Sequence, residues 1–273
     1  MGFYSTMFTQ KTTCHDQLGR RLQILLPARR IISLVPSQTE LLHYLGLEAE
    51  TVGITRFCVH PPEWFRNKPR IGGTKDFRLD RILSLQPDLI LANKEENTQA
   101  GIEQLAALFP VYVSNINTIP DALDMIEQVG NLTHRHQQAR HLAQNIETTL
   151  KKLHRQQKGQ GRRTAYLIWR KPYMAVGSQT FIHHMLTHVC GLQNVFAHIP
   201  RYPDITIQTL QQLQPQLVLL SSEPYPFKKQ HVEELAQVLP HAQICCVDGE
   251  MFSWYGSRLL QAADYLNAFL DQI

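Results

Sequence analysis

The sequence lacks the marks of several specialised protein classes. Its five cysteines in 273 residues are odd in number and have no framework spacing, which excludes a disulfide scaffold. Charged residues make up 18% of the chain, the formal net charge is +4, and no cluster of Lys and Arg alternates with aromatic residues, so a nucleic-acid-binding role has no support. No segment approaches the roughly 18 consecutive apolar residues of a membrane span.

Motifs of the common nucleotide-binding and hydrolytic enzymes are missing too. The chain contains no P-loop, G-x-G-x-x-G, G-x-S-x-G or H-E-x-x-H motif, and this disfavours an enzyme. The 43% of hydrophobic residues is enough to bury a substantial core. Length and composition therefore allow one large globular domain or two smaller lobes.

The N-terminal residues Met1–Lys11 show no basic region followed by an apolar segment, no A-x-A cleavage site and no lipobox cysteine. From these residues we expect a cytoplasmic protein, or a periplasmic one if a signal peptide precedes them in the natural protein. We also expect a monomer that neither inserts into a membrane nor binds nucleic acid.

The first part of the chain alternates strands and helices. Residues 12–26 alternate weakly around the turn Asp16–Gly19 and predict a β-hairpin. Beyond the hairpin, short apolar strands are separated by helical stretches, which favours a parallel sheet covered by helices. The expected strands are Ile31–Val35, Thr51–Ile54, Asp88–Ala92 and Val111–Val113.

A long helical segment separates this series from a second one. Residues 121–156 have only helical character, with one interruption at Gly130-Asn131. Apolar residues at helical spacing between Leu142 and Leu153 predict one helix over Thr133–Gln157, about 36 Å long. We therefore divide the chain into an N-terminal lobe (1–117), a linking helical segment (118–160) and a C-terminal lobe (161–273).

The two series repeat each other. Leu79–Leu91 and Ile207–Leu219 both read as a helix, a Gln-Pro pair and an apolar strand, with a constant offset of 128 positions. Both copies continue to a glutamate, Glu95 and Glu223. Such a duplication predicts two similar α/β lobes with a cleft between them.

Three segments carry a resemblance to a known family: Arg30–Glu40, Gly72–Lys75 and Trp254–Leu260. They resemble the helical-backbone (class III) substrate-binding proteins of ABC importers, which bind vitamin B12, haem or iron-siderophores, and a branch of that family without a signal peptide. The resemblance implies two Rossmann-like lobes joined by a single long α-helix. It also implies a ligand cleft for a bulky, anionic or metal-containing molecule such as a corrinoid, haem or ferric siderophore, and no catalytic residues.

The resemblance also implies roles for individual positions. The positions that line the cleft in the vitamin-B12-binding proteins correspond to Pro36, Phe57, Asn93, Tyr202 and Trp254. The acidic residue of each lobe that docks on an ABC permease corresponds to Asp80 and Gln208, so the second charge is lost.

Reasoning from the residues adds further ligand-binding candidates at predicted strand ends and helix starts. The turn Ser37-Gln38-Thr39 offers backbone N–H groups to an anion, with an ordinary helix cap as the alternative. Cationic and aromatic side chains suit a flat, acidic ligand, with scattered surface charge and loop packing as alternatives. The remaining candidates are Lys75, Arg170, Arg201 and Arg258, the aromatic residues Trp169, Tyr225, Phe252 and Tyr255, and the carboxylates Glu95, Glu223 and Glu250.

Metal and enzyme interpretations remain as alternatives. Cys58 and His60 form a Cys-x-His pair that suits a transition metal, and His60 also suits an axial ligand of a haem or corrin metal. A hydrolase or isomerase would use His60 with Glu95 or Glu250. His184 and His188, four residues apart on a predicted helix, suit a metal or are simply exposed helix residues.

Overall fold

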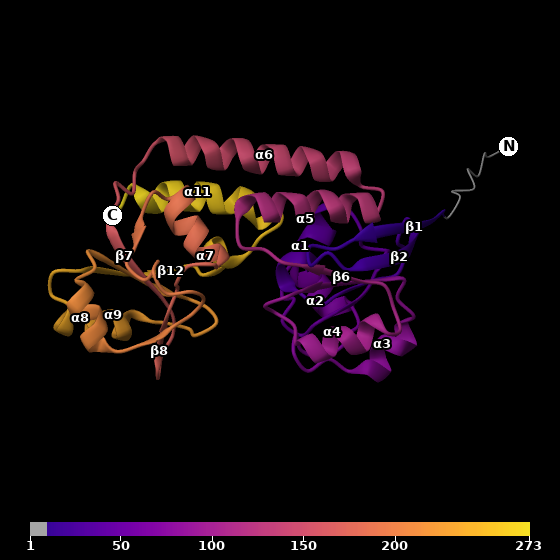
Figure 1. Ribbon diagram of the computed structural model, residues 1–273, viewed down its shortest axis with the longest axis horizontal. Coiled ribbons are helices and arrows are strands. Elements are labelled where there is room, and N and C mark those ends of the chain that lie inside the picture. The colour runs from indigo at the N-terminus through magenta and orange to yellow at the C-terminus, as the bar shows by residue number, and fades with distance from the viewer. Residues whose placement is uncertain (1–9) are drawn as a thin grey trace. The chain divides into compact units, whose positions relative to one another are not determined.

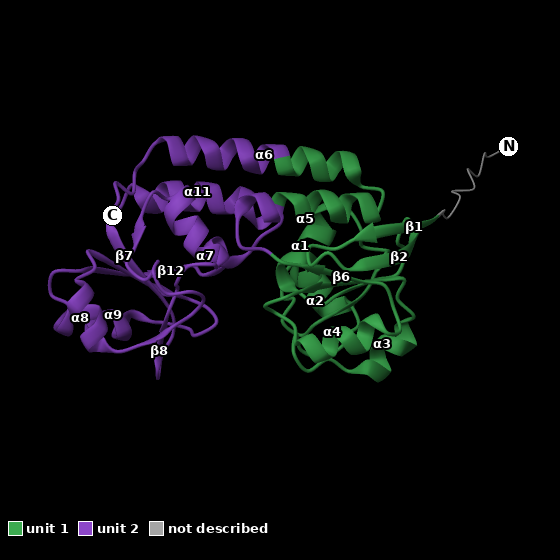
Figure 2. Ribbon diagram, in the orientation of Figure 1, with its two compact units in different colours: residues 1–115, 123–143 green, residues 116–122, 144–273 purple. Residues whose placement is uncertain are grey.

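The structure is a computed structural model that describes residues 10–273 (Figure 1). The described chain divides into two compact α/β units (Figure 2). Unit 1 consists of residues up to Asn115 together with Leu123–Ala143, and unit 2 consists of Ile116–Ala122 and Gln144–Ile273. No helix within residues 10–273 is both long enough and apolar enough to cross a lipid bilayer.

Unit 1 is built on a parallel sheet of four strands in the order β4-β3-β5-β6. All residues of β5 and β6 are buried, as expected for a parallel sheet covered on both faces. The strands are β3 (Ile31–Ser33), β4 (Thr51–Ile54), β5 (Leu89–Asn93) and β6 (Val111–Ser114). The helices between them are α1 (Pro36–Tyr44), α2 (Pro62–Asn67), α3 (Leu79–Leu85) and α4 (Gln99–Ala106).

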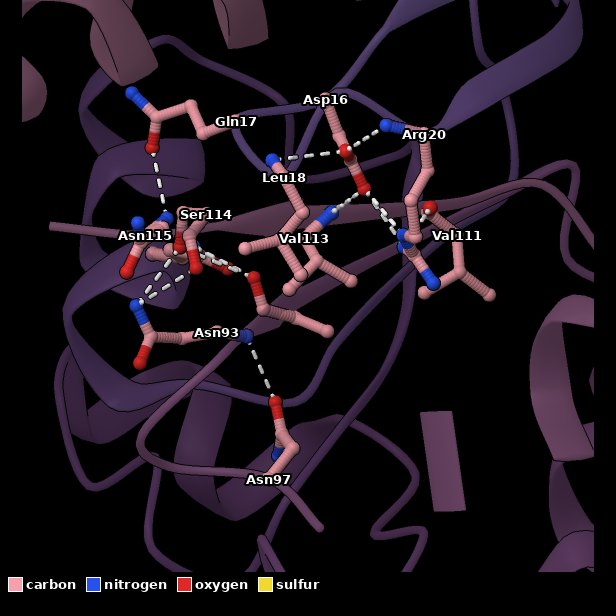
Figure 3. Close-up of polar contacts among 12 residues, drawn as sticks. Asp16, Gln17, Leu18, Arg20, Asn93, Asn97, Val111, Val113, Ser114 and Asn115 are labelled. Atoms are coloured by element: carbon pink, nitrogen blue, oxygen red, sulfur yellow. Dashed lines mark hydrogen bonds and ion pairs between the residues drawn. The ribbon is translucent and has the colours of Figure 1, made fainter. Parts of the chain in front are cut away.

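An antiparallel hairpin, β1 (Gln10–His15) and β2 (Arg21–Leu26), precedes this sheet. Its turn lies against the edge strand β6 (Figure 3). The amide of Val113 donates to Oδ2 of Asp16 at 3.3 Å, and the guanidinium of Arg20 donates to the carbonyl of Val111 at 3.0 Å. The turn thereby binds backbone groups that an edge strand otherwise leaves exposed.

Two helices, α5 (Ile119–Leu132) and α6 (His136–Arg155), follow β6, and each contributes residues to both units. Gly130-Asn131 lies inside α5, so the predicted interruption was wrong by a few residues. A Cβ on Gly130 would lie 2.3 Å from the Cβ of Ala139, so glycine here allows α6 to pack closely instead of ending a helix. The break comes at His134, whose φ is 56°.

Unit 2 contains a six-stranded sheet in the order β10-β8-β7-β11-β12, with β9 also paired to β7. Its core strands β7, β11 and β12 are parallel, whereas β8 pairs antiparallel with both β7 and β10. The strands are β7 (Arg163–Trp169), β8 (Tyr173–Ala175), β9 (Gln193–Asn194), β10 (Asp204–Ile205), β11 (Leu217–Ser221) and β12 (Gln243–Val247). The helices are α7 (Phe181–His184), the π-helix η1 (Met185–Val189), α8 (Ile207–Leu213), α9 (Lys229–Val238), α10 (Glu250–Ser253) and α11 (Arg258–Leu270).

The repeat predicted from the sequence is confirmed in its backbone. The bounds of α3 and β5, moved by 128 positions, are those of α8 and β11. Gln86 and Gln214, which end the two helices, both have a left-handed φ of 44°. Arg30 and Arg163 donate to the last carbonyls of α3 and α8 respectively. The two units therefore share these hydrogen bonds at helix ends, as well as the order of three parallel strands, β3-β5-β6 in unit 1 and β7-β11-β12 in unit 2.

Candidate functional site

The parallel strands of each unit end at one edge of their sheet, where ligands of open α/β sheets usually bind. In unit 1 this edge carries the segments that follow β3, β4, β5 and β6, and in unit 2 it carries those that follow β7, β11 and β12. Most of the predicted site residues lie on these segments.

A buried polar network underlies the edge of unit 1. The amides of Gln38 and Asn93 both donate to Oγ of Ser114, at 2.7 and 3.0 Å. Oδ1 of Asn93 accepts hydrogen bonds from the backbone amides of Glu95 and Glu96, at 2.8 and 3.2 Å. Figure 3 shows the bonds between Asn93 and the end of β6. Asn93 thus fixes the turn after β5.

The burial of this network contradicts part of the ligand-binding site predicted for unit 1. Gln38 and Thr39 are fully buried, and Asn93 is 2% exposed, so these three side chains support the edge and do not line it. Ser37 is 4% exposed and is also covered. Pro36, at the start of α1, is partly exposed.

The open part of the unit 1 edge lies after β4. Phe57 is 49% exposed, and the guanidinium carbon of Arg56 lies 5.1 Å from its ring centroid. Arg56 also forms a 2.9 Å ion pair with Asp76. Lys75 is exposed, and His60 and Glu95 are partly exposed. An exposed aromatic ring beside an arginine therefore follows β4. Arg56 was missed in the sequence, although it stands two residues after a predicted strand.

Cys58 does not suit a metal. Its thiol is fully buried and lies 3.0 Å from Oγ1 of Thr39 and 3.1 Å from Oγ1 of Thr55. Burial raises the pKa of the Cys58 thiol, which disfavours the thiolate that metals bind. Within residues 10–273, no group of three or more His, Cys, Asp or Glu side chains is placed to hold a metal ion. The buried, protonated thiol of Cys58 therefore contradicts the predicted metal site at Cys58 and His60.

At the edge of unit 2, Glu223 after β11 fixes the indole of Trp254. Oε1 of Glu223 accepts hydrogen bonds from Nε1 of Trp254 at 3.0 Å and from Oγ of Ser253 at 2.8 Å. The guanidinium carbon of Arg258 lies 4.9 Å from the ring centroid of Trp254, and Nη1 of Arg258 pairs with Oε2 of Glu250 at 3.0 Å. These contacts hold the ring in one orientation and leave Trp254 8% exposed.

Two predicted lining residues belong to the core of unit 2. Phe252 is fully buried, and Tyr255 is 6% exposed. The ring of Phe252 contacts that of Tyr166, with centroids 5.2 Å apart, and the ring of Tyr255 lies edge-on to Phe181. Both rings therefore point into the core of unit 2 and do not line its edge.

The open aromatic residue of the unit 2 edge is Trp169, at the end of β7. It is 41% exposed, and its ring is edge-on to Tyr225, with centroids 5.7 Å apart. The next residue, Arg170, forms a 2.5 Å ion pair with Glu234. Hydrogen bonds with Tyr225, then with Tyr173, raise the pKa of Arg170. An exposed aromatic residue beside an arginine thus occurs at the edge of both units.

Arg201 and Tyr202 come from the loop before β10 and not from the end of a parallel strand. The guanidinium carbon of Arg201 lies 5.7 Å from the ring centroid of Tyr202, and its Nη1 donates to the carbonyl of Gln179 at 3.0 Å.

The positions predicted to dock a permease, Asp80 and Gln208, are both exposed in the first turns of α3 and α8. A hydrogen bond from Arg78 lowers the pKa of Asp80.

The histidines around η1 predict a pH effect on stability. Burial, and then His188, lowers the pKa of His184 from 6.5 to about 4; His183 acts in the same direction, and Asp121 opposes it. As the pH falls from 6.5 towards 4, the unfolded chain gains a proton here that the folded chain resists, so the free energy of unfolding decreases. We expect His184→Asn to flatten this decrease in urea titrations at pH 7, 6 and 5. The exposed His241→Asn is the control, and an equal slope in all three proteins would contradict the prediction.

Comparison with known proteins identifies relatives. Residues 31–240 match the family model described as periplasmic binding protein. A vitamin B12-binding protein of Pectobacterium carotovorum is 26% identical over 242 residues, covering 87% of each chain.

Solved structures share the fold. The periplasmic vitamin B12-binding protein of Vibrio cholerae superposes with a TM-score of 0.77 at 24% identity, covering 90% of this chain and 98% of the other. A periplasmic heme-binding protein of Roseiflexus sp. RS-1 superposes with a TM-score of 0.76 at 22% identity, covering 89% and 98%. At these identities, the likeness establishes the two-lobed α/β fold alone.

Proposed function

The chain belongs to the periplasmic binding protein family, and we propose that it is the substrate-binding component of an importer for a corrinoid. The curated relative with 87% mutual coverage is a vitamin B12-binding protein, and this favours a corrinoid over haem or a ferric siderophore. All three ligands are bulky and carry a metal inside an organic framework. The first experiment therefore tests which class of ligand is bound, a corrinoid, haem or a ferric siderophore, before any single compound is identified.

The observation that carries the proposal is the exposed aromatic residue beside an arginine at the carboxyl edge of each sheet. In unit 1 it is Phe57 with Arg56 and in unit 2 Trp169 with Arg170. Isolated exposed aromatic rings are costly to hydrate, and such rings give a flat ligand a large contact area. The neighbouring guanidinium groups suit carboxylate or phosphate substituents. We propose Arg56 and Phe57 of unit 1 and Trp169 and Arg170 of unit 2 as ligand contacts, with the exposed Lys75 as a further cation of unit 1.

We expect Trp169→Ala to weaken cobalamin binding by about tenfold, because one large aromatic contact is lost. Titration calorimetry and the visible absorbance of cobalamin measure this affinity. Trp169→Phe retains a ring and should recover most of the binding. Haem and a ferric hydroxamate siderophore are titrated in parallel, and saturable binding of one of them in place of cobalamin would change the ligand but keep the function. No saturable binding of any of the three would contradict the proposal.

Delivery to a membrane partner is the second part of the proposal. Asp80 and Gln208 occupy equivalent positions of the repeat, and both are exposed, which suits docking on an ABC permease through the first turns of α3 and α8. The loss of one charge predicts weaker docking than a pair of carboxylates would give. The names of the Vibrio and Roseiflexus proteins describe them as periplasmic, and this favours the periplasm as the location of this protein.

An enzyme remains the competing hypothesis for the same edges. It would use His60 with Glu95 or Glu250, but Glu250 forms an ion pair with Arg258, which favours a structural role for that carboxylate. The family consists of binding proteins. Chemical conversion of bound cobalamin, abolished by His60→Ala, would favour the enzyme instead.

A further inference from the structure

A pair of stacked histidines lies outside the edges described above. His184 ends α7, and His188 belongs to the π-helix η1 that continues it. Their ring centroids are 4.3 Å apart, and their planes differ by 9°. The wider turn of a π-helix places residues four apart almost above one another, and such turns are frequent at functional sites. His188 is exposed and His184 is partly exposed, so solutes reach the pair.

Hydrogen bonds fix the tautomer of His188. Oγ1 of Thr187 donates its single proton to the carbonyl of His183 at 2.8 Å, because a carbonyl can only accept. Oγ1 also lies 2.9 Å from Nδ1 of His188, so in this contact Nδ1 must be the donor. Nε2 of His188 therefore keeps its lone pair. This is how neutral histidines that bind metals are oriented, with one ring nitrogen donating to a neighbour and the other directed to the ion.

The two neighbouring histidines differ in their hydrogen bonds. Asn194 donates to the carbonyl of Val176 at 2.9 Å and, with its second amide proton, to Nδ1 of His183 at 3.0 Å. His183 is thereby held by Asn194, with its proton on Nε2. Within residues 10–273 the ring nitrogens of His184 have no hydrogen-bond partner, so its tautomer is not fixed and either nitrogen can carry the lone pair that binds an ion.

We propose that His184 and His188 chelate one divalent first-row transition-metal ion through two imidazole nitrogens, with water completing the coordination. Because a metal lies in the plane of the imidazole that binds it and the two rings are nearly parallel, at least one ring rotates out of the stack when the ion binds. Imidazole suits Zn²⁺, Cu²⁺ and Ni²⁺, whereas Mg²⁺ requires oxygen ligands. The carboxylate of Asp121 interacts electrostatically with His184 and adds negative charge near the ion. With two protein ligands the site binds the ion less tightly than a structural zinc centre and exchanges it readily.

The test is titration of the full chain with Zn²⁺ in a buffer that does not bind metal. His184→Ala and His188→Ala should each weaken binding by about tenfold or more, and the double variant should be no weaker than either single one, since chelation needs both rings. Thr187→Val removes the partner of Nδ1 and should weaken binding by about tenfold. His241→Ala, an exposed histidine elsewhere in unit 2, should leave the affinity unchanged, and Mg²⁺ should not bind.

A second measurement does not depend on metal affinity. Long-range ¹H–¹⁵N correlation spectra of the metal-free protein should show His188 protonated at Nδ1, with assignment by comparison with His188→Ala. Equal Zn²⁺ affinity in the wild type and both single variants would overturn the proposal, as would a proton on Nε2 of His188. Circular dichroism of each variant establishes that it is folded.

Discussion

Replacing Phe252 with alanine is expected to lower the free energy of unfolding of unit 2 by about 3–5 kcal/mol. The ring is fully buried, and its centroid lies 5.2 Å from Tyr166, 6.1 Å from Phe269 and 6.4 Å from Tyr265. Truncation leaves a cavity bounded by β7 and α11 and removes three aromatic contacts. Because the rings around it are large and pack against the sheet, the cavity cannot collapse without moving α11.

The measurement uses the positions of the tryptophans. Trp64 belongs to unit 1, whereas Trp169 and Trp254 belong to unit 2. In a common Trp64→Phe background, urea unfolding followed by fluorescence therefore reports on unit 2. Phe252→Leu keeps most of the volume and should cost less than about 1.5 kcal/mol. A cost below about 1 kcal/mol for Phe252→Ala would contradict the core assignment and return Phe252 to the list of ligand contacts.

Phe252 is an example of what the sequence does not predict about the site, namely the direction in which a side chain points. The loops after strands were located correctly, because apolar runs and Gln-Pro pairs fix where strands begin and end. Whether a side chain in such a loop points outward or inward depends on tertiary contacts that no local pattern encodes. Trp169 and Phe252 are both aromatic residues near strand ends, yet one is 41% exposed and the other fully buried.

The fold was more predictable because it depends on periodicity and repetition. The helix and strand of the repeat have the same bounds in both units, and Asp88 and Gln216 accept equivalent backbone hydrogen bonds, from the amides of Arg30 and Arg163. Either a carboxylate oxygen or an amide oxygen can accept this bond, so Asp in unit 1 and Gln in unit 2 serve the same purpose. Strands β8, β9 and β10 were missed, since strands of two or three residues are too short to show alternation.

The buried polar residues that support the candidate site of unit 1 could not be predicted from the sequence either. Ser114 accepts from both Gln38 and Asn93, which are far apart in the sequence and come together only because β3, β5 and β6 are neighbours in the sheet order. A buried Asn or Gln has no sequence signal that separates it from a ligand contact. Burial assigns Gln38 to the support, and for Asn93 the hydrogen bonds of both its amide oxygen and its amide nitrogen do so as well; both are visible in the structure alone.

Asp16→Ala is expected to lower the free energy of unfolding of unit 1 by about 3 kcal/mol, roughly 1 kcal/mol for each of the three backbone hydrogen bonds that its carboxylate accepts. The side chain of Asp16 is fully buried, and that of Arg20, 2.7 Å away, is 33% exposed. The carboxylate of Asp16 accepts hydrogen bonds from the backbone amides of Leu18 and Arg20, at 3.0 and 2.9 Å, and from that of Val113 at 3.3 Å (Figure 3). The substitution leaves these donors, and the guanidinium group, without their acceptor.

Asp16→Asn retains one of the two acceptor oxygens. The amide oxygen can still accept from the amides of Leu18 and Arg20, but the bonds from Val113 and from the Arg20 guanidinium to Oδ2 are lost, so its cost should lie between zero and that of alanine. Fluorescence of Trp64 in a common background with Trp169→Phe and Trp254→Phe reports on unit 1. Hydrogen exchange adds a local measure, since Asp16→Ala should speed exchange of the Val113 amide well beyond the change in global stability. Equal stability of Asp16→Ala and wild type, with unchanged exchange at Val113, would mean that the hairpin turn does not hold the edge of β6.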